Sequence, residues 1–229
     1  MHSMIPTDTA IKCLMIDIGG VLLTNGWDHE ARKRAATLFG LDWADLEARH
    51  QLNFSIYEEG KLSLEEYLQR TVFFVQRSFS HLQFQEFMFA QSQAYPDMLQ
   101  LIRTLKYRYG LKIVVLSNEA RELNAHRIEH FGLAEFVDCF VSSCFVQLRK
   151  PDVDIFRLAL DIVQIPVEQV LYIDNTLMFV QLAESWGIPS ILHTDFRSTC
   201  SKLAAFGLVV EAETTVQVLS YQVPVSSAA

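Results

Sequence analysis

The pattern of apolar and polar residues divides this 229-residue chain into two regions of different character. A continuous apolar run at residues 11–16 is typical of a central strand in a parallel sheet, because both faces of such a strand are buried. Residues 26–95 instead show helical periodicity without strand signals. The helical stretches are residues 31–39, 43–52, 64–75 and 82–90. The pattern therefore predicts one buried strand followed by an insert of about four helices.

From Pro96 onward the pattern changes to a strict alternation of helices and strands. The predicted helices are residues 97–109, 121–131, 152–163, 177–186 and 198–206. The predicted strands are residues 111–116, 139–142, 169–173, 190–192 and 208–210. Strands that alternate with helices imply right-handed crossovers and a parallel sheet that is covered on both faces.

Together these patterns predict an α/β fold, in which a Rossmann-like parallel sheet core carries an inserted helical cap domain. We place the core at residues 11–25 and 96–210, and the helical cap at residues 26–95. Terminal extensions occupy residues 1–10 and 211–229, and the second of these is expected to end loosely.

Composition and charge narrow the possible functions. Apolar residues make up 50% of the chain and charged residues 20%, with a formal net charge of −8. Because Lys and Arg form no run, neither a nucleic acid nor a membrane is an expected partner. The N-terminal residues lack the features of a signal peptide, and the four cysteines form no C-x-x-C pair. We therefore expect a cytoplasmic protein, and the oligomeric state stays open.

Polar side chains follow the predicted strands at the points where these strands end, and such positions meet at one edge of a parallel sheet. They are Asp17, Ser117 with Asn118, and Asp174, joined by Lys150 at the start of a helix. A carboxylate nucleophile such as Asp17 can accept a phosphoryl group and divide hydrolysis into two steps. Asp17 and Asp174 can hold Mg²⁺, which prefers oxygen ligands. A serine hydroxyl and a lysine ammonium can bind phosphoryl oxygens, so the set suits phosphoryl chemistry.

Four motifs in this order resemble those of the haloacid dehalogenase-like (HAD) hydrolases. They are D-I-G-G-V-L at residues 17–22, V-V-L-S-N at 114–118, R-K-P-D at 149–152 and L-Y-I-D-N at 171–175. The resemblance covers the predicted core, and the helical insert stands where the family places a cap of its first class. The first motif is similar to the branch that holds sugar-phosphate phosphatases and the N-terminal phosphatase domain of soluble epoxide hydrolases.

The resemblance implies specific roles for the residues of these motifs. It implies an aspartyl-phosphate intermediate on Asp17, and a Mg²⁺ ion bound by Asp17, the backbone carbonyl of Gly19 and Asp174. Asn175 would hydrogen-bond a water on the metal. The residues implied for the substrate phosphate are Ser117, Asn118 and Lys150, with Lys150 also acting in catalysis.

Two positions depart from the pattern of the family's phosphatases. Gly19 stands where a second aspartate usually serves as general acid and base, and Asn175 stands where a second acid usually follows Asp174. The loss of a positioned general acid typically costs about 10²–10⁴-fold in rate. Three explanations remain: a substrate with a good leaving group such as an anomeric sugar phosphate, a substitute acid at His29 or Glu119, or a weakened or inactive protein.

The sequence thus predicts a Mg²⁺-dependent phosphatase that acts on a small phosphorylated metabolite. One alternative is a 2-haloacid dehalogenase, which requires neither a proton donor nor a metal. Gly19 fits that chemistry, whereas Asp174 at a strand end favours a metal site. Another alternative is a non-enzymatic binding protein built on a degraded HAD fold.

Overall fold

The computed structural model describes residues 10–210, so the predicted terminal extensions lie outside the described residues except for Ala10. Within this range five parallel strands form one sheet in the order β3-β2-β1-β4-β5. The strands are β1 (Cys13–Ile16), β2 (Lys112–Ser117), β3 (Cys139–Ser142), β4 (Val170–Asp174) and β5 (Ser190–Leu192). The predicted α/β class with a parallel sheet is confirmed.

The register of the sheet brings the predicted site residues to one edge. Ile16 at the end of β1 pairs with Val115 of β2 and with Ile173 of β4. The backbone N–H of Asp17 donates to the carbonyl of Ile173 at 3.0 Å. Asp17 therefore leaves the sheet directly beside Asp174, as expected for polar residues at the carboxyl ends of parallel strands.

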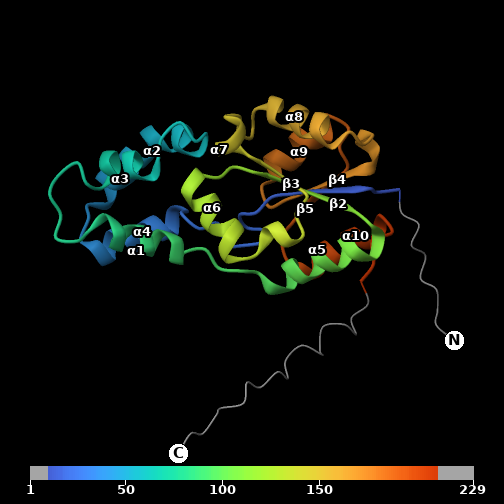
Figure 1. Cartoon of the computed structure of the whole chain (residues 1–229), viewed down its shortest axis with the longest axis horizontal. Helices are drawn as coiled ribbons and strands as arrows, with labels where there is room; N and C mark the ends of the chain where they lie inside the picture. The colour runs from blue at the N-terminus through green and yellow to red at the C-terminus, as the bar shows by residue number, and fades with distance from the viewer. Residues whose placement is uncertain (1–9, 211–229) are drawn as a thin grey trace, which may run out of the picture.

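Helices cover both faces of the sheet (Figure 1). Helices α5 (Pro96–Tyr109) and α10 (Phe196–Ala205) pack on one face, and α8 (Val153–Val163) and α9 (Leu177–Ser185) pack on the other. Successive strand residues point to opposite faces. The core is accordingly made of two apolar clusters separated by the sheet.

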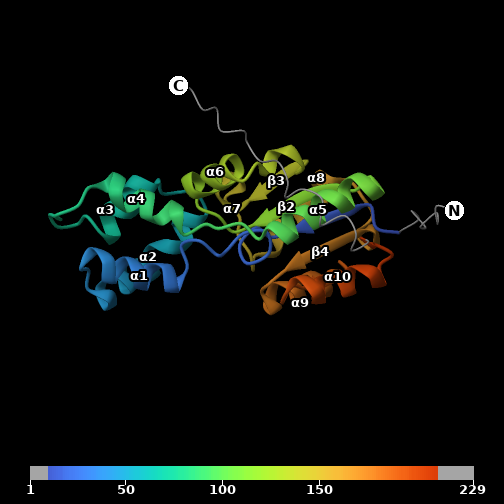
Figure 2. The ribbon, with the colours of Figure 1, turned by 90° about the horizontal axis from the view of Figure 1, so that it is seen from below.

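A helical lobe lies beyond one end of the sheet (Figures 1 and 2). Its helices are α1 (His29–Phe39), α2 (Trp43–Glu58), α3 (Leu64–Thr71) and α4 (His81–Ala90). The lobe has its own apolar cluster, with Phe84 and Met88 fully buried in it. Much of the phenylalanine in this part of the sequence packs in or against that cluster.

The chain enters and leaves the lobe side by side. On the way in, the backbone N–H of Thr24 donates to the carbonyl of Gln93, which lies on the way out, at 2.8 Å. The backbone N–H of Tyr95 donates to the carbonyl of Leu22 at 2.9 Å. These bonds tie the paired linkers, which we call the hinge (residues 22–28 and 91–95), into one unit at the sheet edge.

Two predicted elements differ from the structure. The strand predicted at residues 208–210 is absent from the described residues, because Leu208 is buried by folding back onto helix α10. The backbone N–H of Leu208 donates to the carbonyl of Leu203 at 3.1 Å. Leu208 is therefore apolar because it packs against α10, and it does not pair with a strand. The lobe helix predicted at residues 64–75 ends at Thr71.

Helix α2 is longer than predicted. The sequence pattern places its end at residue 52, whereas the helix continues to Glu58 and stops before Gly60, whose φ is 68°. Helices α6 (Arg121–His130) and α7 (Ser143–Val146) follow strands β2 and β3. The single turn of α7 is too short to give a periodic signal. Among the described residues every helix is too short or too polar to cross a membrane.

Candidate active site

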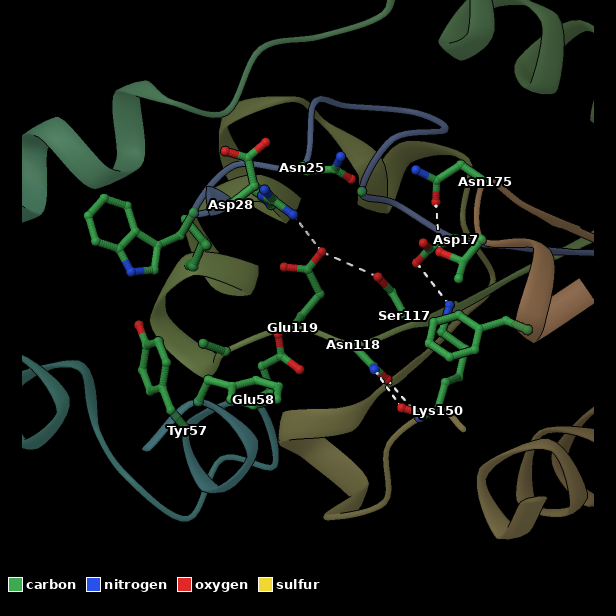
Figure 3. A pocket seen from close by; sticks show the side chains of 18 of the residues that line it. Asp17, Asn25, Asp28, Tyr57, Glu58, Ser117, Asn118, Glu119, Lys150 and Asn175 are labelled. Atoms are coloured by element: carbon green, nitrogen blue, oxygen red, sulfur yellow. Dashed lines mark hydrogen bonds and ion pairs between the residues drawn. The ribbon is translucent and has the colours of Figure 1, made fainter. Parts of the chain in front are cut away.

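A cavity of about 340 Å³ lies between the carboxyl edge of the sheet and the helical lobe (Figure 3). The core contributes Asp17, Ser117 and Lys150 to its lining, and the lobe contributes side chains from the hinge and from α2. Six of the seven predicted site residues line this cavity, namely Asp17, Gly19, Ser117, Asn118, Lys150 and Asn175. This volume is within the range of sites for small ligands.

Asp17 is the carboxylate at the end of the central strand. It is 8% exposed, and one of its oxygens lies 3.3 Å from the ammonium nitrogen of Lys150, which is 1% exposed. Burial raises the pKa of Asp17 to about 6, although the charge of Lys150 acts in the opposite direction. Near neutral pH the group is thus ionised and available as a nucleophile.

Asp174 is held by donors from the protein itself. Its Oδ2 accepts hydrogen bonds from Lys150 Nζ at 2.6 Å and from the Tyr172 hydroxyl, and its Oδ1 accepts one from the backbone N–H of Thr176 at 2.7 Å. The residue is fully buried. Burial lowers the pKa of Lys150, but the carboxylates of Asp17 and Asp174 raise it overall. Asp174 therefore fixes the charged lysine beside Asp17.

Asn175 faces the cavity, whereas Asp174 does not line it. The close approach of Asn175 explains Gly20: a Cβ on Gly20 would lie 2.0 Å from Asn175 Nδ2, and the φ of 73° also favours glycine. Gly19 is different, because its φ is outside the left-handed region and a Cβ there would meet Asn25 Oδ1 at an ordinary 3.4 Å. A side chain at position 19 is therefore sterically acceptable.

Ser117 and Asn118 follow strand β2. Ser117 is 1% exposed and lines the cavity, and its hydroxyl donates to Glu119 Oε1 at 3.3 Å. The side chain of Asn118 clamps the backbone of Lys150: Nδ2 donates to the Lys150 carbonyl at 2.9 Å, and Oδ1 accepts from its N–H at 2.8 Å. Asn118 thereby sets the position of the lysine.

The two candidate substitute acids lie in different places. Glu119 lines the cavity and is 3% exposed, and its Oε1 forms an ion pair with Arg127 at 2.5 Å. Burial raises the pKa of Glu119, with Arg127 opposing the shift. His29 does not line the cavity; it lies 3.6 Å from Glu47, and its ring packs against Trp43. Of the two, only Glu119 can approach a ligand.

Arg127 links the Glu119 side of the cavity to the hinge. Besides Glu119, it donates from Nε to the Ser92 hydroxyl at 3.0 Å and from Nη2 to the carbonyl of Thr24 at 3.3 Å. Its side chain fills the space beside Gly26, where a Cβ would lie 1.8 Å from Nη2. One fully buried guanidinium thus contacts both hinge segments and the carboxylate next to Ser117.

The lobe supplies cavity residues that sequence reasoning missed. They are Trp27, Asp28, Arg32, His50, Phe54, Tyr57 and Glu58. Tyr57 and Glu58 lie in the last turn of α2, beyond the predicted end of that helix, so the pattern placed them outside any element. The glycine at position 60 is the signal that would have extended the helix.

The oxygen atoms near Asp17 determine which kind of metal ion the cavity could bind. No three His, Cys, Asp or Glu side chains of residues 10–210 converge as metal ligands. Asp17, Gly19 and Asn175 nevertheless all line the cavity, and they carry a carboxylate, a backbone carbonyl and an amide oxygen. Such a set fits a hard ion like Mg²⁺, which binds through one or two carboxylates and keeps several waters.

Comparisons with known proteins bear on the fold and the family of this chain. No curated protein matches the chain. A HAD family enzyme from Bacteroides thetaiotaomicron, solved as a magnesium complex, has a TM-score of 0.68 and 20% identity, covering 81% of this chain and 94% of its own. A predicted HAD-like hydrolase from Porphyromonas gingivalis has a TM-score of 0.68 and 21% identity, covering 85% and 98%.

Another similar structure is the L-2-haloacid dehalogenase from Xanthobacter autotrophicus, with a TM-score of 0.57 and 20% identity over 85% of this chain and 83% of its own. At these identities the likeness concerns the fold. The family model of haloacid dehalogenase-like hydrolases matches residues 11–185, which is most of the chain and includes all four motifs. The chain therefore belongs to the haloacid dehalogenase-like hydrolases.

Proposed function

We propose that the protein is a Mg²⁺-dependent phosphatase of a small phosphorylated metabolite, with Asp17 as its nucleophile. The observation that carries the proposal is the buried Asp17 carboxylate 3.3 Å from the Lys150 ammonium, in a cavity that Ser117 also lines. A structurally similar HAD family enzyme from Bacteroides thetaiotaomicron is described in complex with magnesium and inorganic phosphate. That precedent supports a phosphoryl group as the ligand at this edge of the sheet.

In the first step an oxygen of Asp17 attacks the phosphorus of the ester. A bond forms between phosphorus and the carboxylate oxygen, and the bond between phosphorus and the ester oxygen breaks, so an alkoxide leaves. Lys150 and Ser117 hold the phosphoryl oxygens against Asp17 by charge and hydrogen bonding. Asp174 and Asn118 act through Lys150, because they fix its ammonium and its backbone.

In the second step water attacks the same phosphorus. The bond to Asp17 breaks, which regenerates the carboxylate and releases inorganic phosphate. A group must protonate the leaving alkoxide and deprotonate the water. Gly19 carries no such group, and Glu119 accepts hydrogen bonds from Arg127 and Ser117, which is the arrangement of an ionised acceptor. We therefore propose slow turnover unless the leaving group is weakly basic.

The residues that would hold Mg²⁺ are Asp17, the backbone carbonyl of Gly19 and the motif around Asp174. Because the oxygens of Asp174 already accept protein donors, we propose that Asn175 provides the oxygen closer to the ion, directly or through a water. When bound, the ion would supply positive charge that reduces the repulsion between the Asp17 carboxylate and the phosphoryl group.

The helical lobe, at residues 26–95, is proposed to act as a cap domain over the core at residues 11–25 and 96–210. The cavity lies between the two parts and is lined by both. Opening at the hinge would admit substrate, and closure would exclude water from the first step.

A panel of phosphate esters tests the proposal, with Mg²⁺ or with EDTA in excess. The protein is expected to hydrolyse at least one ester with a good leaving group, such as 4-nitrophenyl phosphate, and to lose this activity in EDTA. Asp17→Asn should abolish turnover, while the matched control Asp161→Asn, at an exposed position of α8, should not. Absence of turnover for every ester would contradict the proposal.

Metal-free dehalogenation is the second candidate. Two observations favour it: position 19 lacks an acid, and the oxygens of Asp174 are occupied by Lys150, Tyr172 and Thr176. Halide release from 2-chloropropionate in the presence of EDTA would establish this reaction, and our account expects none.

A further inference from the structure

We propose that a second cavity, beside the first turns of α5 and α10, binds a small primary amine that carries an apolar group and an oxygen acceptor. Its volume is about 340 Å³, which is within the range of sites for small ligands. Among residues 10–210 it shares no lining residue with the active-site cavity, so the inference stands apart from the proposed phosphatase function. The lining consists of Gly20 and residues 95–98 and 193–196.

His193 is the buried polar group that points to a ligand in this second cavity. It is 8% exposed, and burial lowers its pKa, although Asp195 acts in the opposite direction, so the ring is neutral near pH 7. Its Nδ1 lies 2.7 Å from the hydroxyl of Thr199, which is fully buried. Within the described range that hydroxyl has no other acceptor, so we assign its hydrogen to the bond with Nδ1.

This assignment places the imidazole hydrogen on Nε2. No side chain or carbonyl of residues 10–210 accepts from Nε2, although His193 lines the cavity. A buried donor normally has a partner, and an oxygen of a bound ligand would provide one. The donor is also fixed in advance, because the backbone N–H of His193 donates to the carbonyl of Asp174 at 2.8 Å. A preorganised donor binds a ligand with little loss of side-chain freedom.

Two carboxylates determine the charge of the ligand. Asp97, in the first turn of α5, has neither an ion-pair partner nor a hydrogen-bond partner for its side chain in the described part of the chain. Asp195 caps α10: its Oδ1 accepts from the backbone N–H of Ser198 at 2.9 Å, and its Oδ2 accepts from the Thr194 hydroxyl at 3.1 Å. No lysine or arginine within residues 10–210 lines the cavity. The second cavity therefore favours a cation and disfavours an anion.

Two aromatic side chains favour an organic cation. Tyr95 and Phe196 line the cavity and are 39% and 38% exposed, and the buried Met98 lies beside them in the lining. An ammonium group is attracted to the face of an aromatic ring, and an apolar group on the same ligand would cover the exposed rings. The combination of a carboxylate, aromatic rings and one N–H donor thus matches an amine with an apolar group and an oxygen acceptor.

A metal ion fits the second cavity less well. No three His, Cys, Asp or Glu side chains between residues 10 and 210 converge as metal ligands. An Nε2 atom that carries a hydrogen does not offer a lone pair to a metal. The aromatic walls supply no ligand either, so a metal would leave them exposed.

Calorimetry on the full-length protein at pH 6 compares four probes with the same aromatic group. Phenylalaninamide carries both the ammonium and a carbonyl, 2-phenylethylamine lacks the carbonyl, N-acetylphenylalaninamide lacks the charge, and 3-phenylpropionate is an anion. Phenylalaninamide is expected to bind at one site, at least about tenfold more tightly than the N-acetyl probe or the anion. It should also bind more tightly than 2-phenylethylamine, because only the amide accepts from His193.

A variant that combines Asp97→Asn with Phe196→Leu should bind phenylalaninamide at least about tenfold more weakly. The matched control combines Asp161→Asn on α8 with Phe145→Leu on α7, both exposed, and should bind like the wild type. Asp97→Asn alone serves if the combined variant does not fold, because Asp97 is exposed. Asp17→Asn should bind phenylalaninamide like the wild type, so the test is separate from the phosphatase proposal.

Nuclear magnetic resonance of the histidine ring nitrogens locates the bound probe. Phenylalaninamide should shift the ring signals of His193, which are assigned by their loss in His193→Phe, and should leave those of His81 unchanged. The site would be overturned by a lack of saturable binding, by equal affinity for the N-acetyl probe, or by unchanged affinity of the combined variant. Binding that leaves the His193 signals in place would overturn it as well.

Discussion

At the scale of single residues, position 19 bears on how the proposed phosphatase would transfer protons. Glycine there carries no acid, although its backbone conformation and surroundings would accept a side chain. Gly20 is constrained in the opposite way, because Asn175 occupies the space of its missing Cβ. The adjacent glycines therefore differ: packing requires Gly20, whereas the surroundings of Gly19 do not require a glycine.

Gly19→Asp is accordingly expected to raise kcat for an ester with a poor leaving group. A positioned general acid contributes about 10²–10⁴-fold, and we expect a gain of at least about tenfold because the new side chain is not optimised. Steady-state kinetics with an alkyl phosphate provide the measurement. Gly20→Asp, which must displace Asn175, should reduce activity. An unchanged or lower kcat in a folded Gly19→Asp protein would contradict this account of position 19.

Asn175 gives a second prediction at this scale. Asn175→Asp places a second carboxylate at the cavity next to Asp17, so the Mg²⁺ concentration that gives half-maximal activity should fall by about tenfold or more. A titration of activity against Mg²⁺ measures it. Because Asp174 is engaged by Lys150, Asp174→Asn should instead lower stability. The prediction fails if Asn175→Asp leaves the Mg²⁺ requirement unchanged.

The sequence predicted which residues reach the edge of the sheet better than it predicted which side chains those residues contact. The ends of strands β1, β2 and β4 were readable from apolar runs, and this was enough to bring Asp17, Ser117 and Asp174 to one edge. Which of Asp174 and Asn175 faces the cavity depends on the packing of Lys150 and Tyr172, and such contacts leave no local pattern. The metal roles of these residues stay predictions.

At the scale of elements, helix α2 carries the part of the lobe that reaches the site. Its apolar pattern weakens after residue 52, so the turn with Tyr57 and Glu58 could not be predicted from periodicity. The capping box of Ser63 and Glu66 at the start of α3, by contrast, forms between residues only three positions apart in the sequence. Local capping depends on adjacent residues, whereas the end of α2 is stabilised by contacts with the core, such as the bond from the Ser143 hydroxyl to the Glu58 carbonyl.

His50 of α2 makes the stability of the lobe depend on pH. Burial, together with the nearby charge of Arg32, lowers its pKa from 6.5 to about 4, while Glu47 acts in the opposite direction. Between these pH values the unfolded chain binds a proton that the folded chain lacks, so stability falls as pH falls. His50 accounts for up to about 3 kcal/mol of this loss.

Chemical denaturation of the wild type and His50→Gln from pH 7 to pH 4.5 measures the effect. The variant is expected to lose less stability over this range, since glutamine does not titrate and can still accept from the Tyr67 hydroxyl. His81→Gln, which replaces a histidine at the start of α4, is the control and should keep the wild-type slope. Identical slopes for the wild type and His50→Gln would exclude the role of His50.

Arg127 joins helix α6 to both hinge segments. Arg127→Met leaves Glu119 buried without its cation, which typically costs about 3–5 kcal/mol of stability. Combining Arg127→Met with Glu119→Gln removes the unpaired charge, so the double variant should recover part of that loss. Denaturation in urea gives the three free energies of unfolding. A single variant as stable as the wild type would show that the pair does not support the hinge.

At the scale of the whole molecule, the alternation of strands and helices predicted the sheet, its parallel direction and the coverage of both faces. It failed at residues 208–210, where Leu208 is buried without strand pairing and Val209 is exposed. The cavity could not be predicted, because it forms between residues distant in sequence, such as Asp17 and Tyr57. Membership of the HAD-like hydrolases follows from the motifs and the family match, whereas the reaction depends on how the cavity uses Asp17.

The most direct test of the central claim is detection of a phosphoryl group on Asp17. The wild type is mixed with acetyl phosphate and Mg²⁺, quenched in acid during turnover, digested and analysed by mass spectrometry. We predict one phosphoryl group on the peptide that contains Asp17, labile to hydroxylamine and absent from Asp17→Asn. Turnover of acetyl phosphate with no phosphoryl group on that peptide, or equal labelling of Asp17→Asn, would contradict the account.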